Sequence, residues 1–211
     1  MFSYDNKFFD LMNRIMDWFL LSILWIVFSI PVFTFGASTT ALFETVHKVL
    51  RKDKGYVWRT FWNTFKTNFK RSTIVWMIQL GILLLLFADM KIMQMFLAQG
   101  TKSGLLYYFF LVSLGVMYVW VIYTCVYIAR IEDNVKVTMK NSIMLALMSL
   151  PWAVLVLALF IGTVLLVILF PIGVVIVPTC LFFLYDLILM HVFGKYVRMT
   201  DEDKVEDSSE E

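Results

Sequence analysis

One acidic side chain has the type and the position to do chemistry inside an apolar segment. Asp186 follows the uncharged run 141–185 and lies well inside a predicted membrane span. An ionisable group within lipid is costly, and by default it indicates a proton site or an interhelical ion pair. Two other interpretations stay open, because Asp186 could reach the interface near His191 or pair with Lys195 or Arg198.

The residue patterns that support most enzyme reactions are absent from the sequence. It contains no Walker A loop, no Gly-x-Gly-x-x-Gly, no Cys-x-x-Cys, no His-Glu-x-x-His and no Gly-x-Ser-x-Gly elbow. His47 and His191 lack a metal-ligand spacing, and Cys125 and Cys180 are expected to be small buried hydrophobes. The sequence therefore predicts a protein that is not an enzyme, with no catalytic residue, cofactor or metal ion.

A basic, aromatic segment is the second candidate site. Aromatic side chains recur at helical spacing between residues 57 and 71, with cations between them. A helix of this kind lies at the membrane interface and attracts anionic lipid. Two interpretations remain: a docking surface for a partner, or an anchor that only orients the next span. The residues expected to dock are Trp58, Arg59, Trp62, Lys66 and Lys70, and those expected to shape the preceding turn are Gly36, Ser38, Thr39 and Thr40.

Composition indicates which solvent surrounds these residues. The 211-residue chain is 61% hydrophobic and 16% charged, and its mean hydropathy is +0.80. Soluble domains are about 45–50% apolar and about 25% charged, and a sphere of this size cannot hide so much apolar surface from water. These values exclude a soluble enzyme, a disordered chain, a disulfide scaffold and a nucleic-acid-binding domain.

Gaps between charges predict the membrane spans. A helix needs roughly 20 apolar residues to cross a bilayer, and solid apolar blocks favour helices over a β-barrel. The uncharged run 141–185 is long enough for two spans, with a break at Pro171-Ile172-Gly173. We therefore predict an all-α polytopic transmembrane helical bundle with about five spans, at about 14–34, 72–89, 104–129, 150–170 and 172–192.

Two segments lie outside these spans. Residues 36–71 are expected to form a cytoplasmic elbow, with a turn, a short amphipathic helix to about Leu50 and then the basic helix. Residues 1–199 form a single membrane domain. The tail 200–211, with seven acids and one lysine, is expected to be disordered because it cannot fold alone.

The distribution of Lys and Arg predicts the orientation. Residues 36–71 carry eight cations, 130–149 carry three and the C-terminal segment carries three, whereas the N-terminus and the loop 89–103 carry two each. The positive-inside rule then predicts an outside N-terminus and a cytoplasmic C-terminus in the plasma membrane. If the first span were re-entrant or in-plane, the N-terminus would move inside and nothing else would change.

Several sequence blocks resemble the YesL-type family of small integral membrane proteins of Gram-positive bacteria, whose function is unknown. The resemblance rests on PVFTFGASTTAL at 31–42, on Gly55-Tyr56, on FWNTFKTNFK at 61–70 and on KNSIMLAL at 140–147. It implies an accessory role in sugar or oligosaccharide uptake, because members are often encoded beside carbohydrate ABC importers. The Glu-Ala-Ala loop of importer permeases is absent, so the chain does not resemble the permease itself.

The expected function is therefore an accessory or assembly partner of a carbohydrate ABC uptake system. Its expected partners are the lipid bilayer, the permease or ATPase subunits of an importer, or a second copy of the chain, and not nucleic acid. The alternative is a small oligomeric secondary transporter or channel that uses Asp186. Such transporters often have internal repeats, and five unequally spaced spans do not divide into two halves.

Overall fold

The computed structural model describes the backbone of residues 3–99, 101–170 and 177–209, and the side chains of residues 12–99, 101, 104–170 and 177–194. Within these ranges every regular element is a helix and no strand is present. The all-α class is therefore confirmed. The predicted break at Pro171-Ile172-Gly173 lies outside the described residues.

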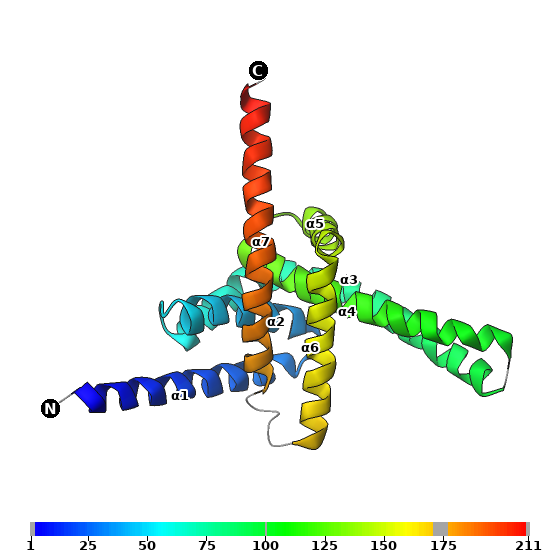
Figure 1. Cartoon of the computed structure of the whole chain (residues 1–211), viewed down its shortest axis with the longest axis horizontal. Helices are drawn as coiled ribbons and strands as arrows, with labels where there is room; N and C mark the ends of the chain where they lie inside the picture. The colour runs from blue at the N-terminus through cyan, green and yellow to red at the C-terminus, as the bar shows by residue number, and fades with distance from the viewer. Residues whose placement is uncertain (1–2, 100, 171–176, 210–211) are drawn as a thin grey trace.

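The described residues form seven α-helices and three short helical segments, which follow one another in sequence (Figure 1). Five of the α-helices are long and apolar enough to cross a membrane, which agrees with the five predicted spans. The elements are α1 (Ser3–Ser29), the 3₁₀ segment η1 (Val32–Thr34), α2 (Phe35–Thr45), the π-helix η2 (Val46–Arg51), α3 (Val57–Ala98), the 3₁₀ segment η3 (Lys102–Leu105), α4 (Leu106–Arg130), α5 (Val135–Met148), α6 (Leu150–Leu169) and α7 (Val177–Ser209).

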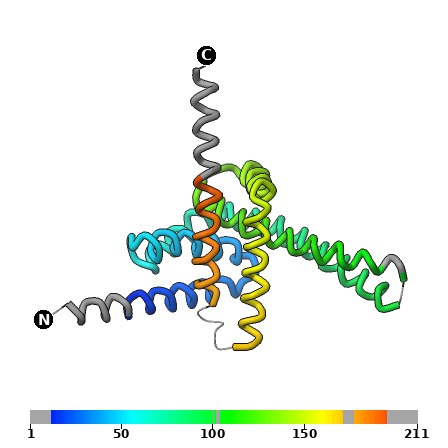
Figure 2. Tube along the Cα trace, in the orientation of Figure 1, coloured from blue at the N-terminus to red at the C-terminus, as the bar shows by residue number. Residues whose placement is uncertain are grey.

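The five apolar helices do not share one direction. Figure 1 shows α3 and α4 as a long hairpin that extends to one side, α1 extending to the other, and α6 and α7 running side by side across both. The tube in Figure 2 shows that the chain turns back after α1 through α2 and η2, at the place where these directions meet. The buried core of the described residues lies where these helices cross, and we call this part of the molecule the crossing region.

Helix α2 is buried on every side, which corrects the predicted elbow. Its residues 36–45 are all buried, whereas an amphipathic surface helix would keep one polar face exposed. The hydroxyl groups tolerate burial because they bond locally: Thr40 Oγ1 donates to the Gly36 carbonyl at 2.8 Å, and Thr45 Oγ1 donates to the Ala41 carbonyl at 2.7 Å. Gly36 and Ser38–Thr40 are therefore helical core residues and do not form a turn.

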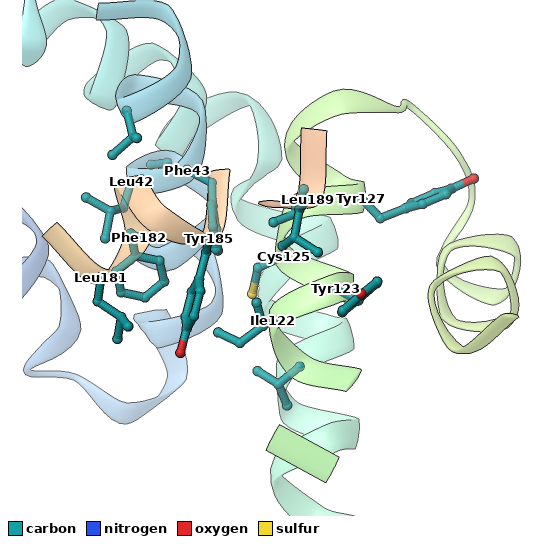
Figure 3. Packing of buried hydrophobic residues seen from close by; sticks show 14 of the residues in the cluster. Leu42, Phe43, Ile122, Tyr123, Cys125, Tyr127, Leu181, Phe182, Tyr185 and Leu189 are labelled. Carbon is teal, nitrogen blue, oxygen red and sulfur yellow. The ribbon is translucent and has the colours of Figure 1, made fainter. Parts of the chain in front are cut away.

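Large side chains from three helices pack against one another in the crossing region. Figure 3 shows Leu42 and Phe43 of α2 facing Phe182 and Tyr185 of α7, with Ile122 and Cys125 of α4 beyond them. Phe43 and Phe182 meet edge to face, with ring centroids 4.8 Å apart. Cys125 is buried as expected, but Cys180 is exposed, so the prediction of a buried residue is wrong at that position.

Helix α3 is continuous, which is a second correction to the elbow. A separate basic helix was expected to end at about residue 71, before a span at 72–89, but α3 runs unbroken through both as a 42-residue helix. At 1.5 Å per residue it is about 63 Å long, roughly twice the ~30 Å thickness of a hydrocarbon core. Residues 57–71 therefore continue the span as a straight projection and cannot lie flat at the interface while 72–89 cross.

Helix α7 is also longer than its predicted span. It continues to Ser209, although the acidic composition predicted disorder from residue 200. Extending an existing helix avoids the costly nucleation step, and Glu and Lys are good helix formers.

A close approach between α2 and α3 explains why residue 36 is a glycine, and it gives a testable prediction. A Cβ atom at Gly36 would lie 2.5 Å from Trp76 Cβ and 3.0 Å from the Ser72 carbonyl oxygen. Because both atoms are held by the α3 backbone, Gly36→Ala must separate the helices, and overpacking of this kind costs about 1–3 kcal/mol. Thermal unfolding in detergent should therefore show a lower Tm.

Gly81→Ala is the matched control, because nothing lies within 4 Å of a Cβ at that position of α3. Replacing an unobstructed helical glycine stabilises by roughly 0.5–1 kcal/mol. A Gly36→Ala protein with a Tm equal to that of Gly81→Ala would contradict the close helix contact.

Candidate functional site

Asp186 is the centre of a buried charged cluster. Its side chain is fully buried on α7, and its Oδ2 lies 3.1 Å from Nδ1 of His47 and 3.2 Å from Nη1 of Arg51. Arg130 Nη2 donates to the other oxygen, Oδ1. The carboxylate thus joins η2, the end of α4 and the middle of α7, and we call these four residues the Asp186 cluster.

The spacing of His47 and Arg51 allows two residues of one short segment to reach the same carboxylate. They are four residues apart in the π-helix η2, and side chains at this spacing lie on one side of a helix. π-Helical turns are rare and are found frequently at functional sites. Here the turn directs an imidazole and a guanidinium group toward Asp186 while Lys48 faces Glu44 at 2.7 Å.

The observed partners favour one interpretation of Asp186. An interhelical ion pair was one of them, and the cluster has that form. The side chains of Lys195 and Arg198, the partners considered from sequence, lie outside the described residues. The arrangement suits a structural clamp better than a proton path.

His47, Arg51 and Arg130 were not identified from sequence as partners of Asp186. The sequence does contain a pattern that indicates one of them. Arg130 directly follows the uncharged run 103–129, just as Asp186 directly follows the uncharged run 141–185. Charges at corresponding ends of two spans lie at similar depth. No comparable signal identifies His47 or Arg51, which are separated from Asp186 by 139 and 135 residues.

The predicted docking residues lie along one side of the first half of α3. Trp58 is 54% exposed, Arg59, Lys66 and Lys70 are exposed, and Trp62 is half-buried. Trp58 and Trp62 stack with centroids 6.1 Å apart, and Lys66 Nζ lies 4.8 Å from the Trp62 ring centroid. We call these five residues the basic stripe.

The aromatic residues of this segment differ in burial. Phe61 and Phe65 are 1% and 7% exposed, and both contact Phe28 of α1, with ring centroids 5.7 and 5.2 Å apart. Trp62 of the basic stripe also contacts Phe28, with centroids 5.5 Å apart, so one edge of the stripe adjoins the core while Trp58 and the three cations are exposed. Among the ion pairs of the described side chains, none includes Arg59, Lys66 or Lys70.

The residues expected to shape the elbow turn join α2 to its neighbours instead. Ser38 Oγ lies 2.7 Å from Ser29 Oγ, and Trp25 Nε1 donates to Thr39 Oγ1 at 3.2 Å. Ser72 Oγ donates to Thr40 Oγ1 at 3.3 Å. Their role is to hold α1, α2 and α3 together behind the stripe.

A side-chain hydrogen bond joins α3 to α4. Gln79 Nε2 donates to Thr124 Oγ1 of α4 at 2.9 Å. In lipid such a side-chain bond contributes about 0.6 to 2 kcal/mol to helix association. Among the described residues, no group of three or more His, Cys, Asp or Glu side chains could hold a metal ion.

Comparison with known proteins adds a family likeness. No curated protein and no solved structure matches the chain. One segment of the chain, however, matches the model of a protein family. This segment begins in α1 and ends in α3, so it includes the basic stripe, His47 and Arg51 but neither Arg130 nor Asp186. Over residues 18–90, the chain is similar to the family described as "Protein of unknown function, DUF624".

Proposed function

We propose that this protein is a non-enzymatic membrane protein that assists a transport complex by docking one of its subunits. The observation that carries the proposal is the basic stripe, whose three cations are exposed on one helix face and are absent from the described ion pairs. Exposed unpaired charges of one sign steer and orient an oppositely charged partner. The partner surface is therefore acidic.

The identity of the partner follows from the resemblance to the YesL-type family. That resemblance implies a carbohydrate ABC importer in the plasma membrane, and we propose its permease or ATPase subunit as the partner, before a second copy of this chain. The straight projection of α3 supports this choice, because residues 57–71 extend roughly 22 Å at 1.5 Å per residue. A helix face of this length offers a surface to a subunit bound at the membrane.

The transporter alternative gains no support from the geometry. A transport site needs an ionisable group that meets an open path, whereas Asp186 is fully buried and already engaged by Arg51 and Arg130. Co-purification from native membranes tests the docking proposal: importer subunits should elute with the wild-type protein and be depleted when Arg59, Lys66 and Lys70 become glutamate.

We also propose that the N-terminus lies on the cytoplasmic side, the outcome that a re-entrant first helix would give. Arg14 Nη2 lies 2.9 Å from Asp53 Oδ2, and Asp53 belongs to the strongly basic segment 36–71, whose charges favour the cytoplasm. Two atoms in contact cannot lie on opposite sides of a ~30 Å hydrocarbon core. The chain reaches Asp53 by turning back through α2 and η2 (Figure 2).

Cysteine labelling in intact cells tests this orientation. In a chain with Cys125 and Cys180 replaced by alanine, single cysteines at Asn13 and Lys54 should both resist a membrane-impermeant maleimide. A cysteine at Gln99, in the turn between α3 and α4, should be labelled and is the positive control. Labelling at Asn13 together with protection at Lys54 would refute the re-entrant arrangement and favour a crossing first helix.

A further inference from the structure

An apolar cavity of about 340 Å³ lies between α4, α5 and α6, with Leu86 of α3 at one edge. Figure 1 shows α5 beside α4 at one end of α6, and the lining extends along α4 over residues 113–120 and along α6 over residues 150–157. Both of these helices are long and apolar enough to cross a membrane. Val116 and Val154 of the lining are 62% and 66% exposed, so the cavity is open to the hydrocarbon that surrounds the two helices.

The polar side chains of this lining are already hydrogen-bonded. Among the lining residues, only Ser113 and Trp120 carry a side-chain oxygen or nitrogen atom. Ser113 Oγ donates to the Phe109 carbonyl oxygen at 2.9 Å, and Trp120 Nε1 donates to Ser142 Oγ at 3.1 Å. Because a bound water needs two to four polar partners, the cavity suits an apolar occupant better than water, an ion or a sugar.

The size of the cavity limits what that apolar occupant is. A helix with its side chains is about 10–12 Å across, whereas a cube of 340 Å³ has an edge of only about 7 Å. A membrane-spanning helix of a second copy is therefore too wide for the cavity, but an extended hydrocarbon chain fits. Leaving the space empty would also lose the dispersion contacts that its lining atoms can make.

Two lysines continue the face of α5 (Val135–Met148) that lines the cavity. Lys136, Lys140, Ile143 and Leu147 are separated by four, three and four residues, which places their side chains on one side of a helix. Ile143 and Leu147 line the cavity, and both lysines are exposed. At 1.5 Å per residue, Lys140 lies about 4.5 Å along the helix axis from Ile143, so its flexible side chain can reach the mouth of the cavity.

These lysines leave positive charge beside the apolar cavity. Among the ion pairs of the described side chains, none includes Lys136 or Lys140. The nearest acids in sequence, Glu132 and Asp133, line a separate cavity together with Arg71. Residues 130–149 belong to the side that the distribution of cations predicts to be cytoplasmic, where anionic lipids give the membrane surface a negative potential.

We propose that this site binds one anionic phospholipid of the cytoplasmic leaflet, with an acyl chain in the cavity and the phosphate group at Lys136 and Lys140. The two features match the two ends of such a molecule. A zwitterionic lipid could fill the cavity but would bring no net charge to the lysines, and a soluble phosphate would leave the cavity empty. The inference is independent of the docking proposal, because none of the basic stripe residues lines this cavity.

Native mass spectrometry of the full-length protein in a non-ionic detergent tests the site. The protein is titrated with dioleoyl phosphatidylglycerol and with dioleoyl phosphatidylcholine, which have the same acyl chains and differ in net charge. The first phosphatidylglycerol should bind at least fivefold more tightly than the first phosphatidylcholine, and Lys136→Gln with Lys140→Gln should abolish this preference. Lys52→Gln with Lys54→Gln is the matched control, because both are exposed cations that do not continue the face lining the cavity, and it should keep the preference.

A second variant tests the place of the acyl chain. Ala146 lines the cavity, so Ala146→Phe should fill part of it and weaken binding of both lipids at least fivefold. The lysine pair lies on the surface and is readable even if Ala146→Phe does not fold. Equal affinity for the two lipids, or equal effects of the two lysine pairs, would overturn the proposal. Wild-type lipid binding by a folded Ala146→Phe protein, or a dimer that excludes the lipid, would overturn it as well.

The lipid site and the basic stripe can be lost separately. Reversing Arg59, Lys66 and Lys70 should leave the preference for phosphatidylglycerol unchanged, since these side chains lie on α3 outside the cavity. Substituting Lys136 and Lys140 should remove the lipid preference and leave association with a docked partner unchanged. Loss of the lipid preference on stripe reversal would mean that bulk charge sets it, and would overturn the lipid site without bearing on the stripe.

Discussion

Replacing Asp186 with asparagine should lower the stability of this protein more than any other single polar substitution on α7. The change keeps the size of the side chain but removes the negative charge that contacts both Arg51 and Arg130. Removing one member of a buried ion pair costs about 3–5 kcal/mol, because the remaining charge stays desolvated. For a chain of this size that corresponds to a fall in Tm on the order of 10 °C.

The measurement is thermal unfolding of the purified protein in detergent, with Asp89→Asn as the control. Asp89 is exposed and absent from the described ion pairs, so its variant should unfold like the wild type. A double-mutant cycle with Arg130→Gln isolates the pair, and the double variant should lose less than the sum of the single losses. An Asp186→Asn protein with wild-type Tm would refute the clamp and restore the proton-site interpretation.

The second large effect is expected at the basic stripe. Reversing Arg59, Lys66 and Lys70 changes the local charge by six units, and like-charge juxtaposition at an interface costs several kcal/mol. We therefore expect at least a tenfold loss of co-purified partner. Stability should change little, because the three side chains are exposed and surface substitutions away from special features fall within about 0.5 kcal/mol.

A matched triple variant controls for net charge. Lys52, Lys136 and Lys140 are exposed cations of the same predicted cytoplasmic side, and their reversal to glutamate changes the total charge equally. This control should retain its partner at wild-type yield. Equal depletion by both triple variants would mean that bulk charge, and not the stripe, governs the association.

The positions of the apolar helices could be predicted because lipid imposes a length and excludes charge. The gaps between charged residues locate α4 and α6 within a few residues of the structure. Gln79 was identifiable for a related reason, since an amide within a span needs a partner on another helix. These predictions depend only on the local solvent of each segment.

The Asp186 cluster and the shape of the elbow could not be predicted, because they depend on contacts between distant segments. Nothing near Asp186 in sequence indicates His47 or Arg51, and the π-helical form of η2 has no simple residue signature. The burial of α2 was missed for a similar reason. Ser38, Thr39 and Thr40 are typical of capping positions, yet here they bond within and between helices.

The basic stripe was found from sequence, but its separation from the core required the structure. Aromatic residues at spacings of three and four can fall on two adjacent faces of one helix, and sequence alone does not distinguish them. Phe61, Trp62 and Phe65 all contact Phe28 of α1, whereas Trp58 and the three cations are exposed. The exposed side chains are the ones that leave a surface for a partner.

The most direct test of the central claim is affinity purification of the wild-type protein from native membranes in mild detergent, with quantitative mass spectrometry of the proteins that co-elute. The docking account predicts permease or ATPase subunits of a carbohydrate importer at near-stoichiometric amounts. A clean homo-oligomer with no co-eluting importer subunit would contradict it.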